Sequence, residues 1–429
     1  MSQSEEEKSH LSRRRFLASG LMAAATAGLG TPAAAAPAGQ ESDSAPATTS
    51  EPFFGAHQGG ILTPLQQHTY FAAFDLTTDN RDDVVSLLQT WTEAAARMSA
   101  GQTAKPLGKD DSVAAPDSGD ALELPPARLT ITFGFGPGLF IKDGRDRYGL
   151  AASRPAALAD LPRFAGDQLA EARTGGDLSV QACADDPQVA FHAIRQLARL
   201  SYGAAEIRWV QTGFSPQFKP GETPRNLMGF KDGTKNPSTK DARQMDKFIW
   251  VNDEGPDWMR GGSYLVVRRI RIALEHWDRM TLAFQEQTVG RHKYSGAPLG
   301  KKNEFDQADY DATDSDGNPV IAQNAHIRLG SAEANDGAQI LRRPYSYNDG
   351  ANVTAERWPP WRDEMEFDAG LFFLCYQRDP RTGFVKIFEK MSKFDMMNQF
   401  VTHTGGGLFA CPGGIAPGEF IGQRLFNKA

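Results

Sequence analysis

The chain has 429 residues, of which 40% are hydrophobic and 23% are charged, and its formal net charge is −7. This length exceeds one ordinary core, so we expect two domains, and the composition is typical of a globular protein. No basic patch is interleaved with aromatic residues, which argues against nucleic-acid binding. Cys183, Cys375 and Cys411 have the spacing of neither a metal knuckle nor a disulfide framework.

The N-terminal segment has the pattern of an export signal. Residues 12–17 read Ser-Arg-Arg-Arg-Phe-Leu and precede a short run of alanine and glycine that is poor as a membrane span. This pattern resembles the twin-arginine signal, with cleavage expected after Ala38. We predict a signal peptide over 1–38 and a polar linker over 39–54. We expect the mature protein to have no membrane span and to be located in the periplasm or outside the cell. The twin-arginine route carries folded proteins, often with a cofactor, so it is a first indication of a prosthetic group.

The next part of the chain alternates between strand and helix patterns. Alternating or β-branched runs predict strands at 68–76, 127–136, 177–184 and 205–214. Helical spacing predicts helices at 81–100 and 187–203, the second with proline in its first turn and glycine at its end. The order β-α-β-β-α-β is that of a ferredoxin-like unit, which we assign to residues 55–215.

A related order recurs in residues 216–429. Strand patterns occur at 262–274, 325–330, 339–347, 370–377 and 405–413, and helix patterns at 275–290 and 383–403. We therefore predict an α+β fold of two tandem ferredoxin-like domains with antiparallel sheets. The acidic stretch 309–319 has the look of a calcium loop, but Ala312 and Gln323 stand where that motif needs acidic ligands. A solvated acidic insertion is the better interpretation.

The loop 225–237 (RNLMGFKDGTKNP) carries the candidate Asp232 between Gly229 and Gly233. An Asp-Gly pair alone is a common turn signal, but this loop connects the two predicted domains, and such connections often carry sites. His326 in NAHIRLG and the pair Arg342-Arg343 are further candidates. Each of these residues, taken alone, is more often structural than functional.

The combination resembles the dye-decolourising peroxidase family, over nearly all of the mature chain. The stretch from Gly229 to Gly233 fits that family's G-x-x-D-G motif, and the segments AHIR, LRRPYSY and GLFFLCYQRD fit its axial histidine, distal arginine and distal wall. The export signal makes the chain similar to the branch associated with bacterial iron uptake. Pro344 departs from the expected glycine and the spacing from His326 is short, which leaves the arginine open between Arg342, which we favour, and Arg343.

The resemblance implies a peroxidase with one haem b per chain in the C-terminal domain. His326 would bind the haem iron, and Asp379 would accept a hydrogen bond from its other ring nitrogen. Asp232 would move the peroxide proton, while Arg342 would stabilise the charge that develops during cleavage. The resemblance also implies roles around the haem: close approach at Gly229 and Gly233, a distal wall at Leu371 and Phe373, and carboxylate binding by Arg328, Thr234 and Asn236.

Two functions are compatible with this resemblance. The first is the oxidation of small aromatic reductants, such as phenols and dyes, by hydrogen peroxide in one-electron steps. The alternative is a deferrochelatase that releases iron from haem and works with proteins of an iron-uptake system. A ferredoxin-like binding module without haem is a third interpretation, and the sequence leaves open whether the protein is a homo-oligomer.

Overall fold

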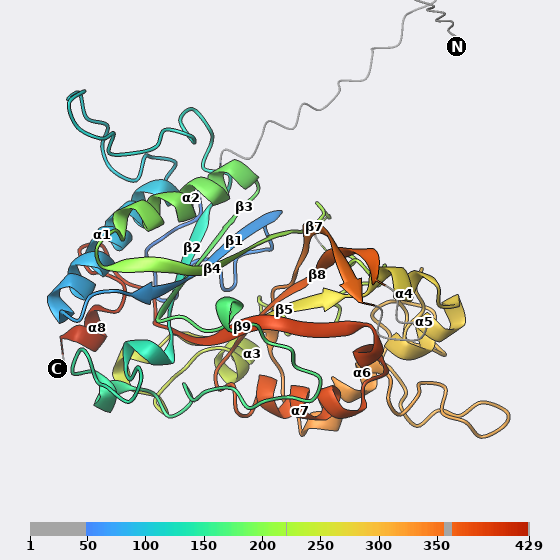
Figure 1. Ribbon diagram of the computed structural model, residues 1–429. Coiled ribbons are helices and arrows are strands. Elements are labelled where there is room, and N and C mark those ends of the chain that lie inside the picture. The colour runs from blue at the N-terminus through green and yellow to red at the C-terminus, as the bar shows by residue number, and fades with distance from the viewer. Residues whose placement is uncertain (1–48, 220, 356–362, 428–429) are drawn as a thin grey trace, which may run out of the picture. The chain divides into compact units, whose positions relative to one another are not determined.

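The computed structural model describes residues 49–219, 221–355 and 363–427 (Figure 1). The predicted signal peptide and most of the predicted linker lie outside these residues. Among the helices that the structure describes, none combines the length and the apolar character that a membrane crossing needs.

The first half of the described chain is a four-stranded antiparallel sheet packed against two helices. Its elements are β1 (His68–Leu76), α1 (Arg81–Ser99), β2 (Thr130–Phe135), β3 (Leu178–Ala184), α2 (Pro187–Leu200) and β4 (Ala205–Phe214). The strands lie in the order β2-β3-β1-β4. Both helices begin at side-chain caps: Asn80 accepts from the Asp82 amide, and Asp186 accepts from the Gln188 and Val189 amides. The six predicted elements of this half are therefore confirmed to within a few residues.

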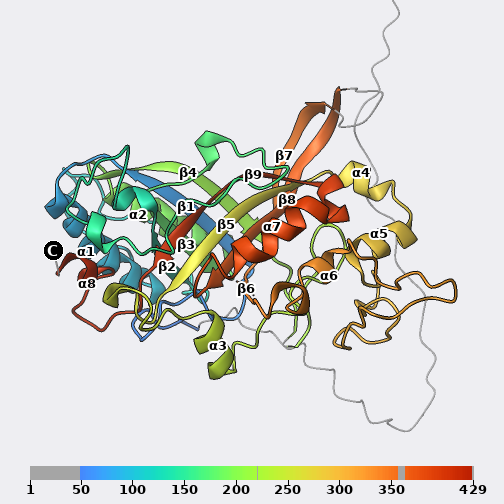
Figure 2. The ribbon, with the colours of Figure 1, turned by 90° about the horizontal axis from the view of Figure 1, so that it is seen from below.

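The second half contains an antiparallel sheet and shorter helices. Its elements are α3 (Ala242–Phe248), β5 (Ser263–Ile272), α4 (Leu274–Asp278), α5 (Leu282–Val289), α6 (His326–Leu329), β6 (Leu341–Arg342), β7 (Tyr345–Ala355), β8 (Asp363–Gln377), α7 (Phe384–Phe394), β9 (Val401–Cys411) and α8 (Gln423–Phe426). Strand β5 lies between β9 and β8, and β8 also pairs with β6 and β7. Helices α6 and α7 lie side by side (Figure 2).

The two sheets join at both edges into a closed arrangement of strands. Strand β2 pairs with β9 at Phe135 and Ala410, and β4 pairs with β7 at Phe214 and Ser346. Side chains from both halves then share a core: the ring of Phe71 on β1 lies 5.7 Å from Phe372 on β8 and 5.9 Å from Phe409 on β9. Pairing and shared core together hold the second sheet rigidly beside the first.

Four predicted elements of the second half differ in the structure. The strand predicted at 339–347 is the two strands β6 and β7. The segment 325–330, predicted as a strand, contains the one-turn helix α6, because so short a segment is decided by its packing rather than by its own alternation. The predicted helix 275–290 is two helices, since the Thr281 side chain caps α5 by accepting from the Phe284 amide. The predicted helix 383–403 ends at Phe394, because Asp395 takes an extended conformation and caps the next turn.

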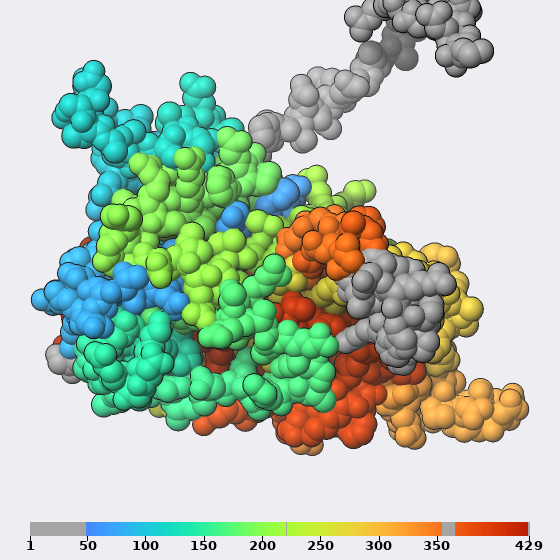
Figure 3. Space-filling model, in the orientation of Figure 1, coloured from blue at the N-terminus to red at the C-terminus, as the bar shows by residue number. Residues whose placement is uncertain are grey.

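The acidic stretch 309–319 is solvated, as predicted. Asp309, Asp311, Asp314 and Asp316 are all exposed. The segment projects from the surface in the space-filling view (Figure 3). Its carboxylates accept hydrogen bonds from amides of the same loop, such as Asp314 from Asp316 and Asn318.

Candidate active site

A cavity of about 470 Å³ lies in the second half of the chain. This volume is within the range of about 300–1,000 Å³ that is usual for small-molecule and cofactor sites. Its wall is mainly apolar and includes Met228, Phe230, Ile270, Ile272, Val289, Leu371, Phe373, Phe388, Met391 and Val401. Leu371 and Phe373 point to the same side because they are two residues apart on β8. Both line the cavity.

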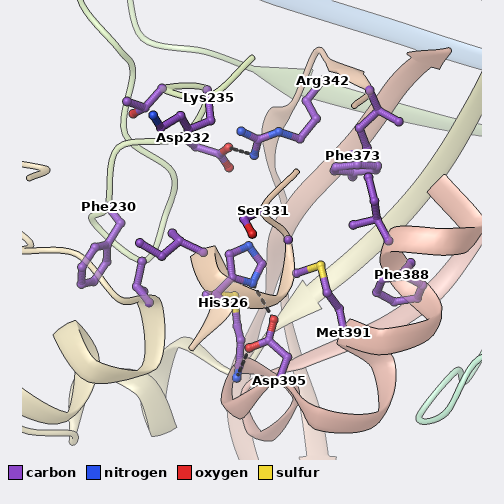
Figure 4. Close-up of a pocket in the computed structure, with 18 of the residues that line it drawn as sticks. Phe230, Asp232, Lys235, His326, Ser331, Arg342, Phe373, Phe388, Met391 and Asp395 are labelled. Atoms are coloured by element: carbon purple, nitrogen blue, oxygen red, sulfur yellow. Dashed lines mark hydrogen bonds and ion pairs between the residues drawn. The ribbon is translucent and has the colours of Figure 1, made fainter. Parts of the chain in front are cut away.

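His326, the first residue of α6, stands on one side of the cavity. Its Nδ1 lies 2.7 Å from Asp395 Oδ2, and the Asp395 side chain is only 3% exposed. Because Nδ1 is engaged, the other ring nitrogen, Nε2, is the one available to the cavity (Figure 4). Burial lowers the pKa of His326, but the charge and the hydrogen bond of Asp395 outweigh burial and raise the pKa above 6.5.

The prediction that Asp379 is the hydrogen-bond partner of His326 is wrong. Asp379 follows β8, and its carboxylate accepts from the Arg381 guanidinium, with Nη2 to Oδ2 at 2.6 Å. The carboxylate that bonds to His326 Nδ1 is that of Asp395. Its other oxygen accepts from the Met397 amide at 2.8 Å, so the cap of the turn after α7 also fixes the carboxylate. The sequence pattern concealed this residue because it lay inside a predicted helix.

Asp232 and Arg342 meet on the opposite side of the cavity from His326 (Figure 4). Asp232 Oδ1 lies 2.7 Å from Arg342 Nη1, and the side chains are 13% and 26% exposed. The Asp232 amide donates to Pro224 O at 2.9 Å, which closes the loop behind the carboxylate. The paired charges come from a loop and from β6, and the structure brings both to the cavity.

Arg343 is the residue after β6, and its side chain has other partners than that of Arg342. Its guanidinium donates to Thr63 O and to Gln66 Oε1, and the residue is 5% exposed. It does not line the cavity, whereas Arg342 does. Of the two alternatives left by the sequence, the geometry favours Arg342.

The three residues predicted to hold haem carboxylates have other partners. Asn236 donates to Arg342 O at 2.7 Å and accepts from the Arg342 amide at 3.1 Å, so it clamps the loop to β6. Thr234 lines the cavity but donates to Glu304 Oε1 at 3.0 Å. Arg328 donates to Ile321 O at 3.1 Å and does not line the cavity. The cations Lys235 and Arg291 do line it, and they have partners as well: Lys235 donates to Gln307 Oε1 at 3.0 Å, and Arg291 donates to Gly296 O at 2.6 Å and Glu304 O at 2.9 Å.

The two glycines of the loop serve different purposes. Both have a positive φ, +85° at Gly229 and +122° at Gly233, which side chains rarely adopt. A Cβ at Gly229 would lie 2.7 Å from Cε of Lys293, so this glycine makes room for a lysine rather than for a ligand. Gly233 lines the cavity and presents its backbone there without a side chain.

The donors of the cavity fit a haem. An axial imidazole suffices for haem iron, whereas zinc and calcium need several protein ligands around one ion. His326 offers one free ring nitrogen in an apolar cavity, and its other nitrogen is bonded to a carboxylate, as a metal-binding imidazole requires. The Asp232–Arg342 pair faces the same space from the other side.

His403 on β9 is a cavity residue to which the sequence assigned no role. It is 8% exposed, and its ring lies 4.6 Å from that of Phe388. Burial, followed by the positive charge of Arg268, lowers the pKa of His403 to about 3. The ring is therefore neutral in the folded protein at any ordinary pH.

This lowered pKa predicts an acid-sensitive contribution to stability. The contribution is complete above about pH 6.5 and is lost as pH falls toward the folded-state value, amounting to about 2 kcal/mol between pH 8 and pH 5. His403→Leu should therefore show a smaller drop in thermal midpoint between pH 8 and pH 5 than wild type. His292→Leu, which replaces an exposed histidine, is the control. Equal pH dependence of His403→Leu and wild type would contradict the prediction.

Known proteins resemble the chain over both halves. Residues 58–215 match the family model "Dyp-type peroxidase, N-terminal" and residues 223–416 match "Dyp-type peroxidase, C-terminal". A dye-decolorizing peroxidase of Thermobifida fusca is 37% identical over the full length of both chains, and a deferrochelatase of Escherichia coli strain 536 is 36% identical over 97% of each. The oxyferrous complex of DtpA from Streptomyces lividans has a TM-score of 0.79 at 41% identity, over 88% of this chain and 98% of that one.

Proposed function

Because the chain belongs to the Dyp-type peroxidase family and is a haem-dependent peroxidase, we propose that it oxidises phenolic and dye-type reductants in one-electron steps. Hydrogen peroxide is the oxidant. One haem b per chain would lie in the cavity of the C-terminal half, between His326 and the Asp232–Arg342 pair. The observation that carries the proposal is this placement of a carboxylate-bonded imidazole opposite an aspartate–arginine pair across one apolar cavity.

On the proximal side, His326 would hold the iron through Nε2. The hydrogen bond to Asp395 fixes the tautomer and orientation of the imidazole and makes it more basic. When bound, the haem supplies the redox chemistry that cleaves the peroxide O–O bond and accepts electrons from reductants. Lys235 and Arg291 are the cations that we propose for the haem carboxylates, in place of Arg328, Thr234 and Asn236.

On the distal side, Asp232 would take the proton from one peroxide oxygen and deliver it to the other, which leaves as water. A positioned proton shuttle of this kind is worth about 10²–10⁴-fold in rate. Arg342 stays charged at any working pH, and it would stabilise the negative charge that develops on the departing oxygen. Its contact with Asp232 and the clamp from Asn236 hold the guanidinium in place before peroxide enters.

A spectrum before and after peroxide tests the function. The purified protein should show the strong absorbance of a bound haem, and one equivalent of peroxide should change that spectrum within seconds. A phenol or dye should then return the original spectrum, with two molecules of reductant consumed per peroxide. A haem spectrum that peroxide leaves unchanged would overturn the proposal.

A second function is supported by the deferrochelatase of Escherichia coli among the relatives. In this case the protein would release iron from haem, and proteins of an iron-uptake system would be its partners. The same preparation distinguishes the two: free protoporphyrin that accumulates without peroxide indicates iron release. Turnover of reductant that depends on peroxide indicates the peroxidase.

We further propose where the protein is located and how its two domains are folded. The twin-arginine pattern at residues 12–17 supports export to the periplasm or the cell exterior. The order β-α-β-β-α-β of the first half, with its sheet order β2-β3-β1-β4, supports a ferredoxin-like domain over 55–215, and the β5-to-β9 sheet supports a second one over 216–429.

A further inference from the structure

Glu304 is a buried carboxylate beside the loop that carries Asp232. It lies in the connection between α5 and α6, and its side chain is 9% exposed. Its Oε2 accepts from Lys231 Nζ at 2.6 Å, and its Oε1 accepts from Thr234 Oγ1 at 3.0 Å. Lys231 precedes Asp232 directly, and Thr234 follows two residues later. One carboxylate therefore holds the loop on both sides of Asp232.

The Lys231 side chain passes close to the backbone of Gly296. A Cβ at Gly296 would lie 2.9 Å from Lys231 Cδ, so the absence of a side chain at this position makes room for the lysine. Burial raises the pKa of Glu304, but hydrogen bonds from Lys231, Thr223 and Thr234 outweigh burial and lower it below the ordinary value. Glu304 is therefore a carboxylate at neutral pH, paired with an ammonium that is directed toward it.

Two acid–base pairs consequently stand next to each other at this side of the cavity. Asp232 pairs with Arg342, and Glu304 pairs with Lys231. Removing one partner of a buried pair leaves an uncompensated charge. A Lys231 ammonium released from Glu304 would be attracted to another carboxylate within its reach. For Lys231 the carboxylate on the adjacent residue is that of Asp232. A contact between them would compete with the bond from Arg342.

We propose that Glu304 is a positioning residue for peroxide cleavage. It keeps the Lys231 ammonium away from Asp232, so that Asp232 faces Arg342 and the incoming peroxide. The inference rests on the proposed function, because it assigns to Glu304 an effect on the proton shuttle of that same site.

The test starts with Glu304→Gln, which preserves the shape of the side chain and removes its charge. The rate of the reaction with peroxide should fall at least about tenfold, while the KM for the dye stays unchanged. Binding of cyanide to the ferric protein, an equilibrium that needs the same distal groups, should weaken in parallel. Asp306→Asn is the matched control, because Asp306 is in the same loop and accepts from the amides of Lys302 and Asn303 within its own turn.

A double variant separates positioning from a general loss of structure. If Glu304 acts by restraining Lys231, then Lys231→Met in the Glu304→Gln background should restore both the peroxide rate and the cyanide affinity to within about threefold of wild type. Lys231→Met alone should be close to wild type. That single variant also decides the question if Glu304→Gln does not fold, and a tenfold slower Lys231→Met would overturn the inference.

Two further outcomes would contradict the role of Glu304 and leave the proposed peroxidase function unaffected. One is a wild-type peroxide rate and cyanide affinity in Glu304→Gln; the other is a double variant as slow as the single one. Asp232→Asn, measured alongside, keeps the two proposals apart. If Asp232→Asn is slow and Glu304→Gln is not, only the inference about Glu304 fails; if Asp232→Asn retains the full rate, the proposed proton shuttle fails.

Discussion

His326→Ala is expected to remove most of the haem from the protein. His326 is the axial ligand that we propose, and its Nδ1 is held by Asp395. Alanine leaves the apolar walls intact but removes the bond to iron, so residual haem should show a changed ligation state. The measurement is the haem-to-protein ratio and the absorbance spectrum after purification.

Two other histidines provide the controls for this variant. His292 is 40% exposed and its Nδ1 lies 2.9 Å from Glu286, outside the cavity lining. His403 lines the cavity but its ring packs against Phe388. His292→Ala and His403→Ala should keep the wild-type ligation state. A normal spectrum in His326→Ala, together with a changed one in either control, would transfer the axial role to that control.

Arg342→Leu should slow the reaction with peroxide by about 10²–10³-fold, the usual cost of removing one preorganised electrostatic group. Haem content should stay near normal, because the axial ligand and the apolar walls are untouched. The measurement is the second-order rate constant for peroxide by rapid mixing. Loss of Arg342 also leaves Asp232 without its cation, and both effects act on the same step.

Arg343→Leu is the matched control, one residue after the end of β6. Arg343, which follows β6, donates to Thr63 O and Gln66 Oε1, so its loss leaves these two acceptors without their donor and should destabilise the fold by about 1–3 kcal/mol for each of them. The thermal midpoint should fall, and the peroxide rate of the folded protein should not. A peroxide rate as low as that of Arg342→Leu would show that the role is not specific to Arg342.

Much of the first half could be predicted from local sequence. Strands β1, β3 and β4 and helices α1 and α2 have clear periodicities and caps, such as Asp186 before Pro187, and their type is decided within a few residues of chain. Short segments of the second half could not be assigned in this way. In α6, four residues follow tertiary packing, because so short a helix has too few internal hydrogen bonds to specify itself.

The sequence by itself determined the family and the candidates Asp232 and His326, because these residues stand in contiguous motifs, and it left the arginine open between Arg342 and Arg343. Only the tertiary structure decided how they are supported. Asp395 lies 69 residues from His326 along the chain, and the end of α7 brings it to the imidazole, whereas the sequence pointed to Asp379. Glu304 reaches Lys231 across 73 residues. Hydrogen bonds between distant segments depend on how helices end and how loops fold back, and no local pattern records that.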